Sequence, residues 1–335
     1  MKKNISLGII GTGRIAKRFV KEIQYISGIE LSAVYNPHIL SAEKFAAEAG
    51  CGVHTDDLND FLSRVDAVYI ASPHGTHYEY AKKALLSGKH VICEKPMTLH
   101  KAEAEELCRL SLENKRVLME SLKTAYCPGY HDLRRVIKEG TIGQVVGVEA
   151  TFTRLTPKDA RECTDAEFGG SFTEFGSYGM LPVFDFLGTD FDNVRFASVY
   201  GDNELDLYTK AFFEYNDLER GAGTEEFRNL RAEAVVTTGI GVKSEGQLLI
   251  TGTKGYILSP SPWWLNSYFE VRFEDPKHIE KHENLYEGDG LRYEIKTFKD
   301  AIESESYGEL CGNSEIIRAF VMEKFLSRRY KKGIE

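Results

Sequence analysis

The sequence has no long hydrophobic run and is poor in proline, cysteine and tryptophan. Its 335 residues include 9 prolines, 6 cysteines and 2 tryptophans. None of its apolar segments approaches the roughly 20 residues that a helix needs to cross a bilayer. The first residues run directly into a strand-like segment, without the apolar stretch and cleavage site of a signal peptide. These absences predict a cytoplasmic protein with no membrane partner.

The cysteines form no Cys-x-x-Cys pair, which is the spacing typical of zinc sites and redox motifs. They lie far apart in the sequence, at Cys51, Cys93, Cys108, Cys127, Cys163 and Cys311. This scatter favours reduced thiols over a disulfide framework or a zinc site.

Basic residues are also fewer than acidic ones. The chain has 42 lysines and arginines against 51 acidic residues, a formal net charge of -9. Nucleic acid is therefore not expected as a partner, because binding it requires a basic surface. The length suits two domains, each large enough to bury a core of its own.

A strand-like run at Ile5–Ile10 leads directly into a glycine-rich turn and then an amphipathic helix. The turn consists of Gly11, Thr12, Gly13, Arg14, Ile15 and Ala16. This order is typical of a dinucleotide-binding crossover. Gly11 would make the tight turn, and Gly13 would let the backbone approach a pyrophosphate at the helix N-terminus. The alternative is a turn whose glycines serve only the chain path.

The cofactor's ribose should lie near the end of the second strand, about 20 residues after the turn. An acidic residue there would select NAD, and an adjacent arginine would bind the 2′-phosphate of NADP. The sequence has Asn36 at this place, which can hydrogen-bond a ribose hydroxyl. NAD and NADP therefore both remain as expected cofactors.

After a helix at about 41–49 and a short third strand around Val53, the fourth strand lies at 66–71. It ends in a loop expected to border the nicotinamide, because ligands bind at the carboxyl ends of strands in such sheets. The loop supplies Ser72, Pro73, His74 and His77 as candidate cofactor contacts. A Pro-Gly turn with Thr76 capping a helix is the alternative. No metal site is predicted, because no acid or cysteine nearby completes the two histidines.

The fifth strand, 89–93, delivers Glu94 and Lys95 to the same edge, and Pro96 ends it. A helix at 101–114 and a strand at 116–120 complete a Rossmann-type, doubly wound parallel sheet. We therefore expect an α/β protein with a dinucleotide-binding domain at 1–121. Residues 122–335 should form an α+β domain for substrate binding and dimerisation, whose last helices can return to the first domain.

The second half predicts a large, mainly antiparallel open sheet. Strand-like runs lie at 144–152, 193–200, 207–215, 232–240, 246–252 and 267–273. A glycine-rich helical segment at 168–180 is costly on propensity alone, which suggests close backbone approach to a ligand or to the nucleotide domain. Two amphipathic helices follow at 290–303 and 313–329. The open sheet predicts a homodimer through its uncovered face.

Three features together resemble the Gfo/Idh/MocA oxidoreductase family, in its dihydrodiol dehydrogenase-like and sugar-reductase branch. They are the glycine turn, the Gly-Lys-His-Val-Ile-Cys-Glu-Lys-Pro run at 88–96, and the Gly-Gly-rich helix at 169–180. The resemblance covers nearly the whole chain. It implies hydride transfer between NAD or NADP and a carbinol or carbonyl carbon of a sugar, cyclitol or related polyhydroxylated small molecule.

The resemblance also implies roles for the Glu-Lys-Pro motif. Lys95 would lie near the nicotinamide, where it transfers a proton or polarises the reacting oxygen. The family's Lys-Pro peptide is often cis, and proline lowers the cost of that form. Glu94 would orient Lys95 or contact the cofactor ribose. The alternative is a surface ion pair beside a turn.

In the glycine-rich helix, the family commonly carries Asp-x-Gly-x-His or Asp-x-Gly-x-Tyr. Alignment puts Glu174 at the Asp position and Tyr178 at the His/Tyr position. Residues four apart share a helical face, so both can contact one substrate. The change from Asp to Glu lengthens the arm by one methylene. Because the ordinary pKa of tyrosine is about 10, Lys95 would be needed nearby for Tyr178 to act as an acid or base. The alternative for Tyr178 is a tyrosine buried at a domain interface.

Two other functions are compatible with the same fold. One is a non-catalytic regulator that binds a dinucleotide as a sensor, and the other is an NAD-assisted glycosidase. Retention of Lys95 and a tyrosine favours a dehydrogenase or reductase over the regulator.

Overall fold

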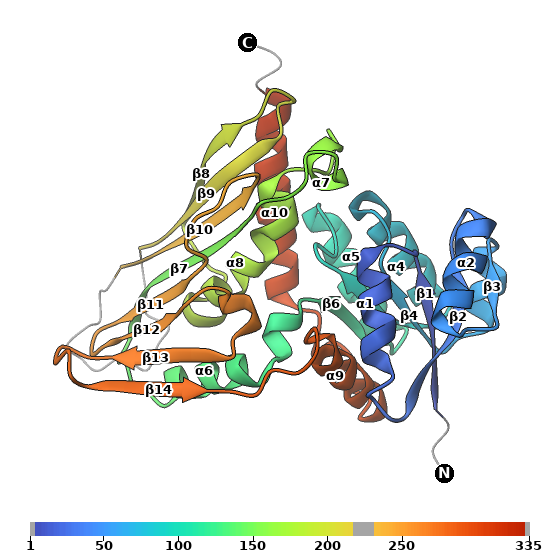
Figure 1. Ribbon diagram of the computed structural model, residues 1–335, viewed down its shortest axis with the longest axis horizontal. Coiled ribbons are helices and arrows are strands. Elements are labelled where there is room, and N and C mark those ends of the chain that lie inside the picture. Colours follow the sequence, from blue (N-terminus) through green and yellow to red (C-terminus); the bar gives the residue numbers. More distant parts are fainter. Residues whose placement is uncertain (1–3, 217–230, 332–335) are drawn as a thin grey trace. The chain divides into compact units, whose positions relative to one another are not determined.

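The structure, a computed structural model, describes residues 4–216 and 231–331 of the chain (Figure 1). The chain divides into two compact units. The first unit comprises Met1–Tyr126 and Glu287–Glu323, and the second comprises Cys127–Tyr286 and Lys324–Glu335. The first unit is therefore built from two separate stretches of sequence.

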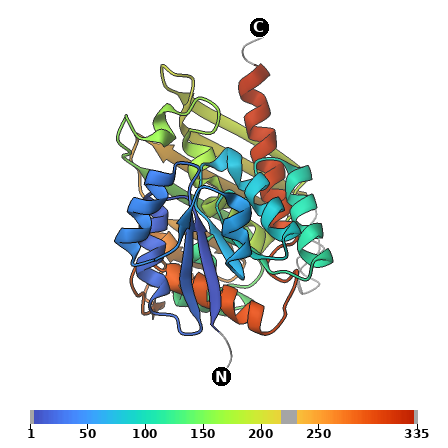
Figure 2. The same ribbon diagram turned by 90° about the vertical axis from the view of Figure 1, so that its right-hand side faces the viewer.

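The first unit contains a six-stranded parallel sheet in the order β3-β2-β1-β4-β5-β6, flanked by helices (Figure 2). This is the strand order of dinucleotide-binding folds, so the predicted Rossmann-type sheet is confirmed. Its strands are β1 Ile5–Ile10, β2 Ile29–Tyr35, β3 His54–Thr55, β4 Ala67–Ile70, β5 His90–Glu94 and β6 Leu118–Ser121. The helices between them are α1 Arg14–Ile23, α2 Ile39–Ala49, α3 Leu58–Ser63, α4 His77–Leu86 and α5 Lys101–Glu113.

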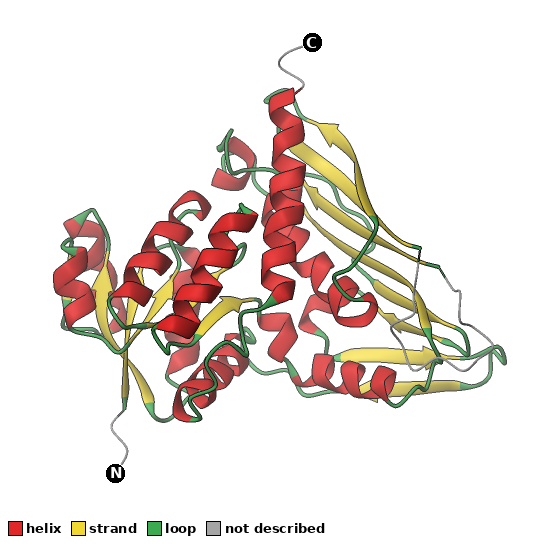
Figure 3. Ribbon diagram, turned by 180° about the vertical axis from the view of Figure 1, so that it is seen from behind, coloured by secondary structure: helices red, strands yellow, loops and turns green. Residues whose placement is uncertain are grey.

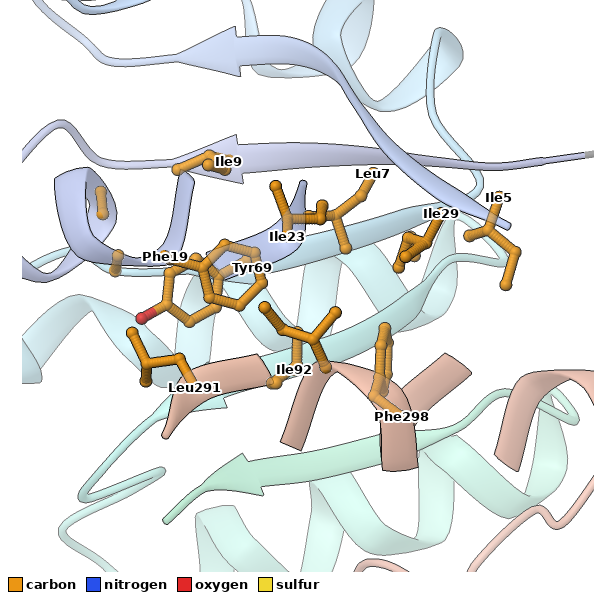
Figure 4. Packing of buried hydrophobic residues seen from close by; sticks show 14 of the residues in the cluster. Ile5, Leu7, Ile9, Phe19, Ile23, Ile29, Tyr69, Ile92, Leu291 and Phe298 are labelled. Carbon is orange, nitrogen blue, oxygen red and sulfur yellow. The ribbon is translucent and has the colours of Figure 1, made fainter. Parts of the chain in front are cut away.

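The strands of this sheet are apolar on both faces because helices cover both sides. One face packs around Phe19 and Tyr69, whose rings stack with centroids 3.7 Å apart (Figure 4). Helix α9 (Leu291–Glu303) adds Leu291, Ile295 and Phe298 to the same core. A segment nearly 300 residues from the N-terminus therefore completes the core of the first unit.

The second unit contains an eight-stranded sheet in the order β14-β13-β12-β11-β7-β10-β9-β8. Among the described strands, only the β7 and β10 pair is parallel, so the expected mainly antiparallel sheet is confirmed. Its strands are β7 Val145–Arg154, β8 Asn193–Tyr200, β9 Asp206–Tyr215, β10 Ala232–Ile240, β11 Leu248–Gly252, β12 Tyr256–Ser259, β13 Tyr268–Arg272 and β14 Ile279–Glu283. The strands β12 and β14 were not predicted; β14 is largely exposed and charged and so lacks an apolar signal.

Helix α8 (Ser171–Leu187) packs against one face of this sheet, and in Figure 3 helices and strands form separate layers there. A Cβ added to Gly179 would lie 2.3 Å from Val236 Cγ1. This glycine therefore permits close packing of the helix on β10 of its own unit. The expectation that the helix glycines admit a ligand or the nucleotide domain is wrong at this position. The other helices are α6 Pro128–Lys138, α7 Arg161–Thr164 and α10 Asn313–Lys331.

One prediction about cysteine is wrong. Cys108 on α5 and Cys311, just before α10, form a disulfide, although reduced thiols were expected. The two are 203 residues apart in sequence, and spacing alone gives no sign of their proximity. The remaining cysteines, Cys51, Cys93, Cys127 and Cys163, form no disulfide among the described residues.

In the part of the chain that the structure describes, no helix is long and apolar enough to span a bilayer. Within residues 4–216 and 231–331, no group of three or more His, Cys, Asp or Glu side chains is placed to hold a metal ion.

The disulfide closes a long loop and should stabilise the fold by restricting the unfolded chain. Reduction should lower the free energy of unfolding by about 2–4 kcal/mol, measured by urea denaturation with and without reductant. Cys108→Ser should abolish the response to reductant, whereas Cys51→Ser should retain it. Identical denaturation curves for the oxidised and reduced protein would show that the disulfide does not stabilise the fold.

Candidate active site

The glycine-rich turn leaves open space at the start of α1. Gly11 has a φ of +101°, and a Cβ there would lie 2.6 Å from the carbonyl oxygen of Ala71, so the turn needs glycine. A Cβ added to Gly13 would meet no described atom within 4 Å. Arg14 and Ile15 begin the helix, and Ala16 is fully buried against the sheet. This arrangement fits a dinucleotide pyrophosphate, which needs close backbone approach at a helix N-terminus.

Asn36 lies directly after β2 and contacts the glycine turn. Its Nδ2 donates a hydrogen bond to Thr12 Oγ1 at 3.0 Å, and its Oδ1 accepts one from the His38 N–H at 2.9 Å. The residue predicted to contact the ribose thus also joins the end of β2 to the turn that follows β1.

The loop after β4 is held by hydrogen bonds within the unit. The Thr76 hydroxyl contacts Ser72 Oγ and the Pro73 carbonyl oxygen, both at 2.7 Å. His74 is buried. His77, the first residue of α4, is fully buried, and its two ring nitrogens lie 2.8 Å from the Pro96 carbonyl oxygen and 3.0 Å from that of Ser72.

Glu94 and Lys95 are both buried at the carboxyl end of β5, with exposed fractions of 9% and 8%. The Lys95–Pro96 peptide is cis, as the resemblance implied. Glu94 Oε1 accepts hydrogen bonds from the Tyr69 hydroxyl at 2.5 Å and from Ser121 Oγ at 3.3 Å. A surface ion pair beside a turn, the alternative considered for this motif, does not describe two buried side chains.

Glu294 of α9 is a second buried carboxyl beside Glu94 and was not predicted from the sequence. Its Oε1 accepts a hydrogen bond from Ser121 Oγ at 2.7 Å, while its Oε2 has no hydrogen-bond partner among the described residues. Burial, followed by repulsion from Glu94, raises the pKa of Glu294 well above its ordinary value. Burial and the neighbouring Glu94 also raise the pKa of Tyr69. The Tyr69 hydroxyl therefore keeps its proton and donates a hydrogen bond to Glu94.

In the second unit, Glu174 and Tyr178 occupy one face of α8. Across residues 171–184 every side chain is buried except these two, which are partly exposed. Their spacing of one helical turn puts them next to each other. The sequence-based alignment therefore selected the two positions of this stretch that remain accessible.

An aromatic cluster flanks Tyr178, and the sequence analysis did not identify it. The Phe152 ring lies 5.1 Å from the Tyr178 ring and is stacked between Phe175, at 4.3 Å, and Trp264, at 3.8 Å. These residues come from β7, α8 and the short 3₁₀ helix Trp263–Leu265, so only the fold brings them together.

The start of α8 is fixed by the buried carboxylate of Asp206. Asp206 Oδ2 accepts hydrogen bonds from Ser171 Oγ at 2.6 Å, from the Phe172 N–H at 2.9 Å and from Thr209 Oγ1 at 2.8 Å. A carboxylate at this end of a helix satisfies an N–H that has no partner in the helix. Asp206 therefore sets where the helix that carries Glu174 and Tyr178 begins.

A parallel sheet in this strand order, with an open glycine turn at the first helix and a buried lysine at the carboxyl end of β5, defines a dinucleotide-binding protein. Residues 5–122 match the family model described as "Oxidoreductase family, NAD-binding Rossmann fold", the GFO_IDH_MocA family. Over these residues the chain is similar to that family of oxidoreductases.

Two curated relatives are similar to the chain. A scyllo-inositol 2-dehydrogenase (NADP(+)) of Bacillus subtilis is 38% identical over 141 residues, which are 41% of this chain and 43% of that protein. A trans-1,2-dihydrobenzene-1,2-diol dehydrogenase of Xenopus tropicalis is 24% identical over 88% of each chain.

Among solved structures, a 3-ketoreductase of Actinomadura kijaniata in complex with NADP and TDP-benzene superposes with a TM-score of 0.78. It is 22% identical, and the match covers 96% of each chain. This likeness shows that the fold extends over both units.

Glu294 generates a prediction about stability and pH. Its carboxyl has a raised pKa in the folded protein, so the folded state is favoured below the unfolded pKa of ~4.3 and loses that advantage as pH rises through the folded value. Glu294→Gln removes this titration. The variant should match the wild type near pH 4 and exceed it by about 1 kcal/mol or more at pH 8.

Urea denaturation across this pH range would measure the difference, with Glu43→Gln on the exposed face of α2 as the control. If the free energies of unfolding of the Glu294→Gln variant and the wild type differed by the same amount at all pH values, the raised pKa of Glu294 would be contradicted.

Proposed function

We propose that the protein is an NAD(P)-dependent oxidoreductase acting on a carbinol or carbonyl carbon of a sugar, cyclitol or related small polyhydroxylated molecule. The observation that carries the proposal is Lys95, buried at the carboxyl end of β5. The glycine turn follows β1 in the same parallel sheet, so both lie at the edge where ligands bind. The names of the relatives, an inositol dehydrogenase and a dihydrodiol dehydrogenase, support this substrate class.

The first unit is proposed as the dinucleotide-binding domain, and the second as the domain for substrate binding and dimerisation. The proposed cofactor contacts lie at the carboxyl ends of four strands, β1, β2, β4 and β5, at one sheet edge, with either NAD or NADP as cofactor. They are Gly11, Thr12, Gly13, Arg14, Ile15, Asn36, Ser72, Pro73, His74, Glu94 and Lys95. His77, which was expected among them, is fully buried with both ring nitrogens beside backbone carbonyl oxygens, so it would act through the backbone of Ser72 and Pro96.

The bound nicotinamide would supply or accept the hydride. In the direction of reduction, the carbonyl oxygen must also gain a proton, and in oxidation the hydroxyl must lose one. We assign this proton to Lys95 and Tyr178, whose donors would also stabilise the developing alkoxide. Glu174 shares the accessible face of α8 with Tyr178 and is suited to accept a hydrogen bond from a substrate hydroxyl.

Lys95→Ala should lower kcat by about 10²–10⁴-fold, which is the usual contribution of a general acid or base. Affinity for NADH and NADPH should change little, because the backbone of the glycine turn remains. Turnover would be assayed with inositols, sugars and a dihydrodiol, and cofactor binding by fluorescence titration. Lys83→Ala, at an exposed position of α4, serves as the control. Wild-type turnover in Lys95→Ala would show that Lys95 is not catalytic.

A homodimer through the open sheet is also proposed. Phe212, Val235, Leu249 and Leu258 lie in one row across β9, β10, β11 and β12, with Glu149 of β7 between the second and third. Their neighbours in sequence point the other way, as Val236 does toward Gly179 of α8. The row therefore lies on the face away from α8, and its apolar side chains are only half-buried.

Val235→Glu should convert the dimer to a monomer, because two copies of a symmetric interface would each bury a new charge. Sedimentation velocity at micromolar concentration would measure the mass. Leu40→Glu, at a leucine that is 75% exposed on α2, should leave the mass unchanged. A wild-type protein that sediments as a monomer would refute the proposed dimer.

A cytoplasmic location is the final part of the proposal. It is supported by the nicotinamide cofactor, a metabolite of the cell interior, and by the four cysteines that form no disulfide among the described residues. The Cys108–Cys311 disulfide is the feature that argues for an oxidising compartment.

A further inference from the structure

The peptide that follows Lys95–Pro96 is held on both of its polar atoms by buried ionisable side chains. The Pro96 carbonyl oxygen lies 2.8 Å from His77 Nδ1. The Met97 N–H donates to Glu120 Oε1 at 3.0 Å. His77 is 0% exposed and Glu120 is 4% exposed. We infer that His77 and Glu120 are positioning residues, which hold the backbone at Lys95 through the Pro96–Met97 peptide.

Both side chains are themselves anchored. The other ring nitrogen of His77 lies 3.0 Å from the Ser72 carbonyl oxygen, so the imidazole joins the segments that follow β4 and β5. Glu120 Oε2 accepts a hydrogen bond from Arg318 Nε of α10 at 2.8 Å, and Arg318 is 5% exposed. A buried carboxylate needs such a partner to remain charged.

The backbone on the other side of Lys95 is also hydrogen-bonded to a carboxylate. Its own N–H donates to Glu94 Oε2 at 3.3 Å. Since proline has no N–H, each available N–H from residue 95 to residue 97 is bonded to a carboxylate. Hydrogen bonds to charged acceptors are about twice as strong as neutral ones. The backbone on both sides of the Lys95 Cα is therefore fixed, and this fixes where the lysine side chain starts.

This inference rests on the proposed function, because a precise start for the Lys95 side chain matters only when Lys95 reaches a reacting oxygen. A misplacement of about 1 Å can reduce turnover by about 10²-fold. The hydrogen bonds themselves exist whatever the protein catalyses. The two claims can therefore be tested separately.

Two substitutions at His77 separate its two contacts. In His77→Asn the side-chain amide takes the place of Nδ1 and can still donate to the Pro96 carbonyl oxygen. In His77→Gln the longer amide takes the place of Nε2 and keeps only the contact with Ser72. Glu120→Gln retains the size of the side chain but cannot accept hydrogen bonds from both Met97 and Arg318.

We expect kcat to fall about 10²-fold in His77→Gln and Glu120→Gln, and less than about 10-fold in His77→Asn. The dissociation constants for NADH and NADPH should stay within about threefold of the wild type. Hydrogen exchange of the peptide spanning residues 94–100, followed by mass spectrometry, should be faster in the two impaired variants alone. His54→Gln, at an exposed histidine of β3, is the matched control.

Equal losses of kcat in His77→Asn and His77→Gln would overturn the inference, because a residue that merely fills space would give that result. Wild-type kcat with accelerated exchange in His77→Gln and Glu120→Gln would overturn it too. If the wild type reduces or oxidises nothing in the panel, the proposed function fails. The exchange data then test only whether His77 and Glu120 fix the Pro96–Met97 peptide. Unchanged exchange in both variants would refute that.

Discussion

The structure of the first unit depends on how it satisfies polar groups at the carboxyl ends of β4, β5 and β6. A buried carboxylate without partners costs several kcal/mol, and Glu94 is buried there. Tyr69 from β4 and Ser121 from β6 hydrogen-bond it, so the three strand ends are linked side by side. The edge at which a dinucleotide would bind is therefore a hydrogen-bonded network rather than a set of independent loops.

The segment that returns to the first unit supplies partners for further buried polar groups. The segment Glu287–Glu323 contributes apolar side chains from α9 to the sheet's core. It also brings Arg318 to the buried Glu120 and Glu294 to Ser121. Cys311 adds a covalent link to α5. A Rossmann-type domain ending at residue 121 would lack a charged partner for Glu120 and the cover of α9.

Patterns of neighbouring residues in the sequence predicted the features that depend on neighbouring residues. Alternation of apolar runs and glycine turns predicted both sheets, and the motifs predicted the glycine turn, Glu94, Lys95 and the accessible pair on α8. The Glu120–Arg318 and Ser121–Glu294 contacts left no local signal, because the partners are 198 and 173 residues apart in sequence. The disulfide was missed for the same reason. Strand β14 was missed because an exposed edge strand needs no apolar face.

The candidate residues of the first unit and those of the second unit are held in place in different ways. In the first unit, Lys95 lies on a segment whose backbone is hydrogen-bonded to the buried ionisable side chains of Glu94, His77 and Glu120. In the second unit, Glu174 and Tyr178 lie on a regular helix whose remaining face is buried. There one carboxylate, Asp206, fixes the first turn, and the close packing of Gly179 on Val236 fixes the depth of the helix on the sheet. Because a helix transmits its register rigidly, these few contacts suffice to orient both side chains. A loop has no such regularity, so the backbone at Lys95 is positioned by hydrogen bonds to separate side chains instead.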